Sequence, residues 1–538
     1  MEFRCHDFES DELYFHPLIN AKKMKKIISF MSLLIIILVA SATPCKSQPG
    51  TLDLSFNVKG FVTDSLILPQ KNMQGRAILT QTDGKILVSA MIYVPTIKAK
   101  IYRYNEDGTP DLSFGRNGIQ ELNYNFGASI ESLALQPDGK IVGAGYGVTE
   151  GGLYVWTVIR LNPNGSYDPT FGTEGKVETI FYGSTELAHC VRVLPGGMLL
   201  VSGMVKNTNT NVVEFIMVRY QTNGTLDPAF GSDGITIYVT PDGAGFARGI
   251  ACLQSDGKIV LGGYRTFPGN RPKFTMMRFS PDGILDASFG NDGLTIDSLG
   301  IGHLSYAFTI QPDDKILIPG MVFFTDYINP HMSISRYLAD GTIDNNFADQ
   351  GHYIGELGLF AMATVQTDGK IIASGRFLAD STIRTPVVGC LLPSGLPDPD
   401  FGNNGIFLLD QSLPGSLFGI NLDRQGKIIS TGTCNESSES GYHLLTLRLN
   451  SLATGVVEGI HEPLLQLTPN PVIDHVTIQL NEPGQFKMTL YSMDGKQILE
   501  SQLTQETITT DLTFLKSGVY FIHINGSFGL KTAKLVKL

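Results

Sequence analysis

Residues 136–141 read QPDGKI, and nearly the same six letters return at 81–86, 254–259, 311–316 and 366–371. Weaker copies are LPGGML, from Leu194, and LDRQGKI, from Leu422. The turn position of the motif falls at residues 84, 139, 197, 257, 314, 369 and 426, so successive copies stand 55 to 60 residues apart. A supersecondary unit repeated at this spacing cannot bury its apolar face alone, which predicts a stacked or radial repeat array.

A second motif has the same period, half a unit out of phase, and it predicts that the array closes into a ring. Its clearest copy is RLNPNGSYDPTFG at 160–172. The other complete copies begin at Arg103, Arg219, Arg278, Arg336 and Cys390. The last copy is split, because RLN stands at 448–450 whereas GTLDLSF stands at 50–56. The two ends can complete this unit by pairing, which removes the exposed sheet edges of an open array.

Each unit also reads as four short strands. In the fourth unit they are predicted at 235–240, 249–254, 258–264 and 274–280, and each is rich in β-branched and aromatic residues bounded by turn formers. The Pro-Asp-Gly turn at 137–139 supplies a fixed φ, a self-bonding side chain and a residue that tolerates positive φ. The sequence therefore predicts an all-β fold, a seven-bladed β-propeller of about 57-residue repeats over 48–455.

The two motifs resemble those of the delta-60 repeat family, over nearly all of residues 50–450. The resemblance implies propeller blades, and seven copies imply a seven-bladed ring. It brings no established catalytic residues. The chain departs from the pattern where Cys390 replaces the motif arginine, where Ala348 replaces a glycine, and in the third unit, which lacks the motif glutamine and lysine.

After Gly455 the period stops, and a linker over 456–464 is predicted to lead into a small β-sandwich over 465–538. This segment is similar to the type A C-terminal sorting domain of the bacterial type IX secretion system. The resemblance rests on PNP at 469–471, LYSMDGKQI at 490–498, LKSGVYFIHI at 515–524 and KLVK at 534–537. Its motif residues are Pro469, Asn470, Pro471, Asp494, Gly495, Lys496, Gly518 and Tyr520. The resemblance implies a passenger that the type IX machinery of a Gram-negative bacterium of the Bacteroidetes type carries to the surface.

The N-terminal region is predicted to be a signal peptide, within residues 1–47. Four lysines between 22 and 26 precede an uncharged stretch at 27–42, which is 16 residues long and so shorter than the roughly 20 that a membrane helix needs. Residues 1–23 precede a second start, Met24, and are interpreted as a start-site extension. Cleavage after Ala42 and cleavage after Ser47 both remain open. A lipid anchor on Cys45 is disfavoured by the proline before it. No transmembrane segment is expected after signal removal.

Charge and cysteine content narrow the class of protein further. The 538-residue chain has a formal net charge of −11, which argues against nucleic acid as a partner. Four cysteines follow the signal region, at 190, 252, 390 and 434. They are too few for a disulfide scaffold, so buried thiols are favoured, and Cys390 with Cys434 is the one pair to test.

Neither a catalytic residue nor a cofactor or metal site is predicted. The histidines are scattered along the units without metal-ligand spacing, and neither a nucleophile elbow nor a phosphate-binding loop occurs. Most units have an Asp or Asn before the turn glycine, and an Asp follows three residues after it, which suggests a tight turn rather than calcium. The recurrent arginines favour structural Arg–Asp pairs over a ring at the axis.

The loops after the QxDGKI strands repeat least and are the candidate binding face. They mix aromatic residues with cations, which suits sugar rings or peptide side chains; the alternative is that they are ordinary exposed turns. The candidate residues are Arg265, Phe267, Arg271, Phe323, Phe324, Tyr327, Arg376, Phe377 and Arg384.

Three functions are compatible with these features. The first is a non-catalytic secreted or cell-surface propeller that binds a glycan or a protein through one face. The second is a surface protein whose repeats supply only bulk and rigidity. The third is a hydrolase or lyase with an axial site, for which the sequence names no acid–base pair.

Overall fold

The computed structural model describes residues 48–64, 72–93, 97–122, 127–239, 246–267, 271–297, 299–325, 328–379, 383–435, 441–451, 465–468, 472–480, 486–492, 496–503, 507–526 and 529–537. The chain divides into two compact units, Met1–Ala453 and Thr454–Leu538. Apart from one short 3-10 turn, η1 (Pro195–Gly197), every regular element of the described residues is a strand, so the predicted all-β class is confirmed. None of the described segments forms a helix long and apolar enough to cross a membrane.

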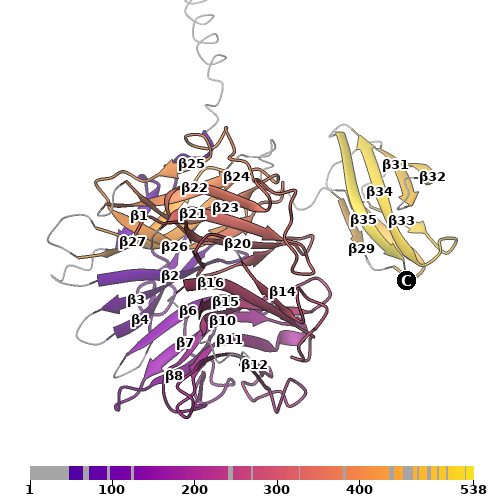
Figure 1. Cartoon of the computed structure of the whole chain (residues 1–538). Helices are drawn as coiled ribbons and strands as arrows, with labels where there is room; N and C mark the ends of the chain where they lie inside the picture. Colours follow the sequence, from indigo (N-terminus) through magenta and orange to yellow (C-terminus); the bar gives the residue numbers. More distant parts are fainter. Residues whose placement is uncertain are drawn as a thin grey trace, which may run out of the picture. The chain divides into compact units, whose positions relative to one another are not determined.

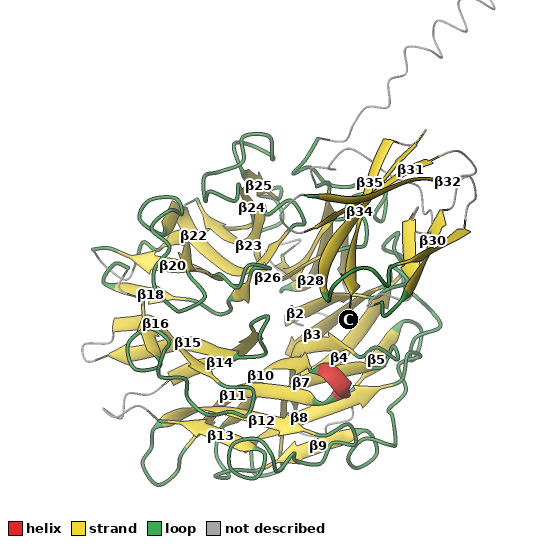
Figure 2. Cartoon of the chain, turned by 90° about the vertical axis from the view of Figure 1, so that its right-hand side faces the viewer, coloured by secondary structure: helices red, strands yellow, loops and turns green. Residues whose placement is uncertain are grey.

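The strands of the first unit form antiparallel sheets that follow the sequence repeats, and the views agree on a radial arrangement about one axis (Figures 1 and 2). Four of the sheets each hold four consecutive strands. The first contains β2 (Asn72–Thr80), β3 (Ile86–Tyr93), β4 (Ile97–Tyr104) and β5 (Ile119–Glu121), and the second contains β6 (Ala128–Leu135), β7 (Ile141–Val148), β8 (Tyr154–Leu161) and β9 (Lys176–Thr179). The third contains β10 (Glu186–Val193), β11 (Leu199–Lys206), β12 (Val213–Tyr220) and β13 (Ile235–Tyr238), and the fourth contains β14 (Phe246–Leu253), β15 (Ile259–Phe267), β16 (Arg271–Phe279) and β17 (Leu294–Ile296). The first strands of neighbouring sheets contact one another, β2 with β6, β6 with β10 and β10 with β14, and so surround the axis.

The fifth and sixth repeats share one eight-stranded sheet because a single long strand belongs to both. This strand, β22 (His352–Val365), pairs through its first half with β21 and through its second half with β23. The other members are β18 (Gly302–Leu304), β19 (Thr309–Ile310), β20 (Ile316–Phe323), β21 (His331–Tyr337), β23 (Ile371–Leu378), β24 (Arg384–Leu391) and β25 (Ile406–Leu408). The seven sequence repeats therefore map onto five separate sheets and this joined one.

The predicted closure through the chain ends is present in the remaining sheet. It contains β26 (Gly415–Leu422), β27 (Ile428–Cys434), β28 (His443–Leu449) and, from the other end of the array, β1 (Phe61–Asp64). β1 pairs antiparallel with β28, and the Arg448 guanidinium lies 2.7 Å from the Asp53 carboxylate. The two halves of the split motif therefore meet and complete one sheet.

The second motif connects each sheet to the next one through hydrogen bonds and side-chain packing. Arg160 Nε donates to Asp168 at 2.7 Å, its guanidinium lies over the ring of Phe171 at 4.6 Å, and Nη1 donates to the Thr222 carbonyl in the next repeat. Asp168 also accepts backbone and hydroxyl hydrogen bonds from Thr170. The structural interpretation of the Arg–Asp pairs is therefore confirmed, because the arginine is almost fully buried between two sheets.

The phenylalanines of the second motif lie in the core. Each is 0–1% exposed: Phe56, Phe114, Phe171, Phe230, Phe289, Phe347 and Phe401. Where Cys390 replaces the arginine, Lys370 Nζ bonds the Asp398 carboxylate at 2.9 Å, and the buried Cys390 thiol lies 3.6 Å from the same group. Cys390 is thus a thiol rather than half of a bridge to Cys434.

We expect stability to fall in acid because of the motif carboxylates. Burial alone raises the pKa of Asp53, Asp111 and Asp168, but hydroxyl and lysine hydrogen bonds and the motif arginine outweigh it, so each pKa is lowered from 3.8 to about 2. A folded-state pKa below the unfolded value gives stability that is complete above pH 4 and lost as the pH falls toward 2. Urea midpoints between pH 7 and pH 2 would measure this loss. An Asp168→Asn variant should be less stable at pH 7 and show a shallower acid decline; parallel curves would contradict the assignment.

The second unit contains two sheets that pack over one apolar core. One sheet holds β29 (Leu465–Thr468), β30 (His475–Leu480) and β33 (Thr507–Asp511), and the other β31 (Phe486–Ser492), β32 (Gln497–Leu503), β34 (Gly518–Gly526) and β35 (Gly529–Lys537). Core side chains come from both sheets, among them Val476 and Ile478 from β30 and Leu490 and Ile522 from β31 and β34. This unit thus has a core of its own, which fits an independently folding module.

Candidate functional site

Six strands nearest the axis carry extra residues at equivalent places, and these bulges aim side chains toward the axis. The pairing register shifts in β2 between Gly75 and Ala77, and likewise in β6, β10, β14, β22 and β26. In the fifth repeat, residues 305–308 separate β18 from β19 at the equivalent position. We call the side chains at these positions the axial ring: Arg76, Glu131, His189, Arg248, Tyr306, Ala361 and Phe418. All seven line one cavity of about 210 Å³, the axial cavity.

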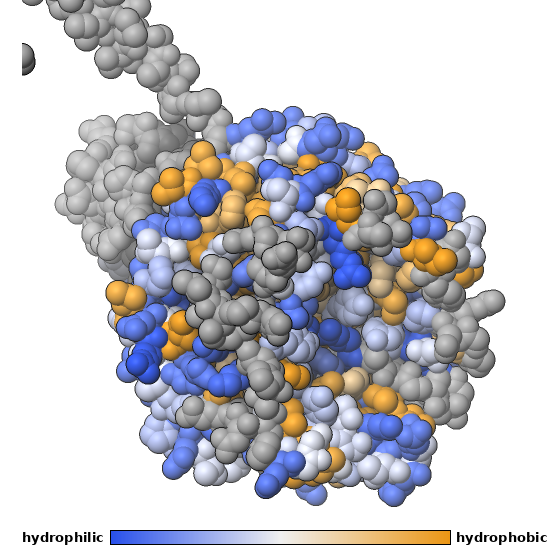
Figure 3. Space-filling model, turned by 90° about the vertical axis from the view of Figure 1, so that its left-hand side faces the viewer, coloured by the Kyte–Doolittle hydropathy of each residue, from blue (hydrophilic) through white to orange (hydrophobic). Residues whose placement is uncertain are grey.

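The axial cavity has a charged half and an apolar half. The first four members of the ring, from β2, β6, β10 and β14, are Arg, Glu, His and Arg, whereas Ala361 and Phe418 face them from β22 and β26, with Met362 beside them. Figure 3 shows a hollow in the middle of one face, with strongly hydrophilic residues inside and hydrophobic ones around it. A site with one apolar wall and a few convergent polar groups has the usual character of a ligand pocket.

Glu131 is held ionised by two arginines. Its carboxylate lies 3.6 Å from Arg76 Nε and 3.7 Å from Arg248 Nη1, and it accepts a hydrogen bond from Ser129 at 2.6 Å. Burial raises the pKa of Glu131, but the charges of Arg76 and Arg248 outweigh burial, and the net pKa is lowered. A carboxyl in this state is a poor general acid, since that role needs a raised pKa.

His189 completes the charged half as a neutral imidazole. Burial, then the charge of Arg248, lowers the pKa of His189 to about 3. Its Nδ1 atom has no hydrogen-bond partner within the described part of the chain, although the side chain is only 8% exposed. Buried polar atoms without partners are uncommon in folded proteins, and one that lines a cavity is available to a water or a ligand.

Arg248 is placed by a strained backbone. Its φ is +62°, in the left-handed region that costs residues with a side chain roughly 1–2 kcal/mol. The side chain reaches Glu131 and lies over the Tyr306 ring at 5.1 Å. The next residue, Gly249, cannot carry a side chain, because its Cβ would lie 2.1 Å from the Gly203 carbonyl oxygen. Strain of this kind persists where surrounding structure imposes it, often at binding sites.

A second hollow adjoins the axial cavity; we call it the side pocket. It has a volume of about 470 Å³ and shares Arg376 and Phe418 with the axial cavity, so the two meet there. Its lining comes from the ends of β2, β3, β23, β24, β26, β27 and the approach to β28. The lining residues are Asn72, Met73, Gln74, Tyr93, Arg376, Arg384, Gly415, Ser416, Phe418, Thr433 and Tyr442. These strand ends lie on the face that carries the loops after the QxDGKI strands.

Two of the nine candidate residues from the sequence, Arg376 and Arg384, lie together in the side pocket. They stand on the paired strands β23 and β24, where Leu378 is opposite Arg384 and Arg376 is opposite Pro386. Burial and then the charge of Arg384 lower the pKa of Arg376. Among the described residues, neither guanidinium forms an ion pair or a side-chain hydrogen bond, which contrasts with the buried motif arginines.

The other candidates are dispersed. Arg265 is buried and its guanidinium lies over Phe267 at 4.6 Å, whereas Phe323 is a core residue at 5% exposure. Phe324 is 42% exposed and contacts the His331 ring. Phe377 is partly buried and packs on the core between the fifth and sixth repeats. Tyr327 and the side chain of Arg271 lie outside the described residues. Of the nine candidates, only Arg376 and Arg384 are thus brought together among the described residues, and the binding role of these loops stays a prediction.

Sequence reasoning missed the axial ring, although a signal for it existed. Most ring residues stand five positions before the first residue of the QxDGKI motif or its weaker copy, as Arg76 does before Gln81 and Glu131 before Gln136. That position changes from arginine to glutamate, histidine, tyrosine, alanine and phenylalanine, whereas the residues on either side of it are uncharged in every unit. A glycine in the second strand marks the same bulge, because a Cβ on Gly145 would lie 1.9 Å from the Ser129 carbonyl oxygen.

A Ser–His–Asp constellation in the fifth repeat is structural rather than catalytic. Ser333 Oγ lies 3.1 Å from His303 Nε2, and His303 Nδ1 lies 3.2 Å from the Asp297 carboxylate. All three residues are 0–1% exposed inside the sheet. A nucleophile needs access to its substrate, which this burial denies.

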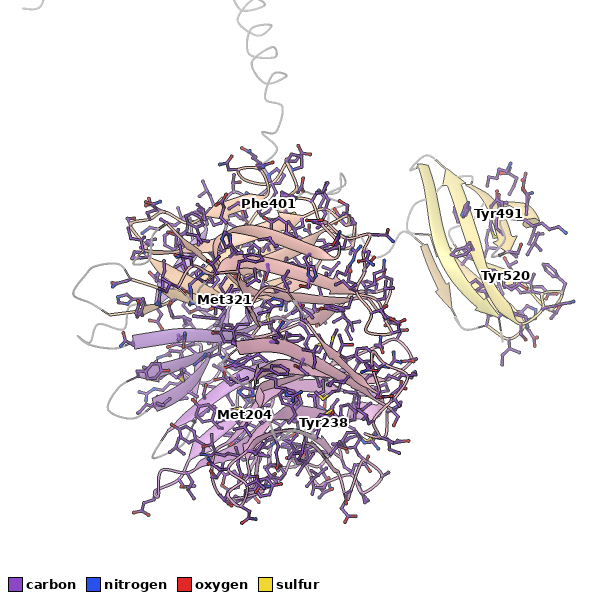
Figure 4. All side chains as sticks on the ribbon, viewed as in Figure 1. Met204, Tyr238, Met321, Phe401, Tyr491 and Tyr520 are labelled. Carbon is purple, nitrogen blue, oxygen red and sulfur yellow. The ribbon has the colours of Figure 1, made fainter. Side chains whose placement is uncertain are left out.

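In the second unit, three of the predicted sorting-domain residues are described. Gly518 begins β34, and Tyr520, labelled in Figure 4, donates its hydroxyl to the Lys516 carbonyl at 2.8 Å. Lys496 precedes β32. The predicted residues at 469–471 and 494–495 lie outside the described residues.

Comparisons with known proteins identify both units. Residues 81–114, 136–171, 197–230, 254–289 and 366–401 match a beta-propeller domain of unknown function, DUF5122. Residues 466–538 match the secretion system C-terminal sorting domain. No curated protein matches the chain. The chain is thus a β-propeller repeat protein with a type IX sorting domain, which is exported to the cell surface or beyond.

Solved structures resemble the chain distantly. A protein of unknown function from Dyadobacter fermentans is 12% identical, with a TM-score of 0.39, and the match covers 73% of this chain and 99% of that one. Drosophila Semaphorin 2a is 9% identical, with a TM-score of 0.42 and coverage of 88% and 97%. The β-propeller domain of the Trilobed protease from Pyrococcus furiosus is 11% identical, with a TM-score of 0.36 and coverage of 70% and 95%. Likenesses at these values support no inference about function.

Removing the sorting domain should separate export from folding. A chain that ends at Gly455 keeps every described strand of the first unit. We expect it to melt as cooperatively as the longer chain in vitro, but to remain in the periplasm of a host with type IX secretion. Cell fractionation and thermal melting measure the two outcomes. Surface exposure of the truncated chain, or its failure to fold, would contradict the division of roles.

Proposed function

We propose that the protein is a non-catalytic binding module of the cell surface or its surroundings, and that its ligand, a glycan or a protein, enters the joined axial cavity and side pocket. The observation that carries the proposal is the axial ring. Equivalent positions of the repeats hold different side chains there, although the repeats are alike elsewhere, and those side chains line one cavity. A surface protein whose repeats supplied only bulk and rigidity would not require different side chains at these positions.

The lining favours binding over hydrolysis. Glu131 is the one carboxylate among the described residues that line the two hollows, and two arginines hold it ionised. A glycoside hydrolase of the common type uses two carboxyl groups, one of them with a raised pKa. Aromatic rings are available for binding instead, since Tyr93, Tyr442 and Phe418 line the side pocket.

Ligand binding should depend on Phe418, where the two hollows meet. A screen of the purified chain against arrayed glycans and outer-surface proteins would supply a ligand for calorimetry. Phe418→Ala is expected to weaken binding about tenfold or more, because aromatic anchors in a pocket commonly contribute 2 kcal/mol or more. Phe324→Ala is the matched control, since this exposed phenylalanine lines neither hollow. Equal affinities of the two variants would overturn the site, and product release from the ligand would favour a hydrolase or lyase.

A further inference from the structure

The two hollows concentrate positive charge on an acidic protein. The whole chain has a formal net charge of −11, yet four arginines and one carboxylate line the joined hollows. Arg76 and Arg248 are engaged with Glu131, whereas Arg376 and Arg384 have no carboxylate partner among the described residues. Two guanidiniums that line one pocket from paired strands suit an anion, because arginine presents paired N–H donors that fit carboxylate and sulfate oxygens.

We propose that the side pocket selects an acidic sugar, and that Arg376 and Arg384 bind its carboxylate or sulfate group while the aromatic residues contact its ring. This inference rests on the proposed binding function and adds the chemical class of the ligand. Tyr93 and Tyr442 are 43% and 41% exposed, so their rings offer accessible apolar faces beside the cations. The side chains of Asn72, Gln74, Ser416 and Thr433 supply donors and acceptors for hydroxyl groups.

The sheet pairing favours a saccharide over an acidic peptide. Extended peptides commonly bind by adding a strand to an open sheet edge. Four of the strands that end at the side pocket, β3, β23, β24 and β27, already have a partner on both sides. The other two, β2 and β26, are the first strands of their repeats, and each lies against the first strands of the neighbouring repeats. A ligand with its own ring hydroxyls and an anionic substituent instead matches side-chain donors around a hollow of about 470 Å³, within the usual size range of small-molecule sites.

The test compares three galactose-based oligosaccharides of equal length, one carboxylated (oligogalacturonate), one sulfated and one neutral, by calorimetry on the purified full chain. We expect at least one acidic oligosaccharide to bind and the neutral one to bind at least tenfold more weakly. Arg376→Gln and Arg384→Gln should each weaken acidic binding about ten- to a hundredfold, the range expected for charge-assisted hydrogen bonds. Affinity should fall with added salt. Arg116→Gln removes an exposed arginine that lines neither hollow and should change nothing.

The possible outcomes distinguish a failure of the acidic-sugar assignment from a failure of the proposed binding function. Tight binding of the neutral oligosaccharide that Phe418→Ala weakens but Arg384→Gln does not would overturn the acidic-sugar assignment and leave the binding site intact. Binding of an acidic peptide alone, with loss in the arginine variants, would likewise overturn it. If Arg116→Gln and Arg384→Gln weaken the binding of the acidic oligosaccharide equally, the loss reflects the net charge of the protein rather than the side pocket, and the acidic-sugar assignment is overturned as well. If a ligand from the wider screen binds and Phe418→Ala leaves its affinity unchanged, both proposals fail together.

Discussion

Deletion of residues 48–63 should abolish cooperative unfolding of the propeller, the largest effect expected for this chain. The deletion removes Phe56, which is 0% exposed, and the Asp53 carboxylate, which pairs with both Arg448 and Lys427 at 2.7 Å. A lost core phenylalanine costs about 3–5 kcal/mol, and an orphaned partner of a buried pair costs about as much. Together these approach the whole stability of a typical domain, about 5–15 kcal/mol. Thermal unfolding followed by circular dichroism would measure it.

A relocated segment provides the control for this deletion. Residues 48–64 can be joined through a flexible linker to the end of β28, so that the same β1–β28 pairing forms in a different chain order. This permuted chain should recover the cooperative transition, because only the position of the chain break has changed. An unaltered melting temperature in the simple deletion would refute closure as a source of stability.

Substitution of the motif phenylalanines should produce the next largest effects. Phe171→Ala is expected to lower the free energy of unfolding by about 3–5 kcal/mol. Phe171 is fully buried under the Arg160 guanidinium and reaches the next repeat, where a Cβ on Gly224 would lie 3.1 Å from its ring. The side chain therefore fills space between two sheets, and its truncation leaves a cavity at their interface. Urea unfolding would measure the loss.

The matched variant is Phe324→Ala, at a phenylalanine that is 42% exposed. Its unfolding free energy should change by less than about 1 kcal/mol, as exposed substitutions usually do. A loss below about 1 kcal/mol for Phe171→Ala itself would contradict its place in the core.

The repeat architecture was predictable because it rests on local rules that recur. Turn residues, alternating apolar positions and the Arg–Asp–Phe spacing appear in nearly every unit, so an error in one unit is corrected by the others. The ring closure was predictable from the split motif for the same reason. In the other units the motif Asp follows eight residues after the motif position that Arg448 occupies, so Arg448 has to take its Asp from the other end of the array. The C-terminal unit was predictable from its sequence motifs rather than from a repeat period.

The candidate site was only partly predictable, because a site at an axis is assembled from residues that are far apart in the chain. Arg76 and Phe418 share a cavity across more than three hundred residues, and no local pattern indicates that they meet. The sequence also placed Phe323 and Arg265 on a binding face, whereas strand pairing turns both into buried positions. A residue beside a loop can face either way, and a shift of one position decides which.

The contact between Asp53 and Arg448 also has a consequence in time. The two residues are 395 positions apart, and ribosomes add roughly 5–20 residues per second. The first strand is therefore made roughly 20 to 80 seconds before its partner exists. Throughout that interval β28 has not been made, and β1 is an unmatched edge that can pair with any strand it meets. A chain built in this way is complete only when its last repeat arrives, so whatever delays folding until synthesis ends protects it from joining its neighbours.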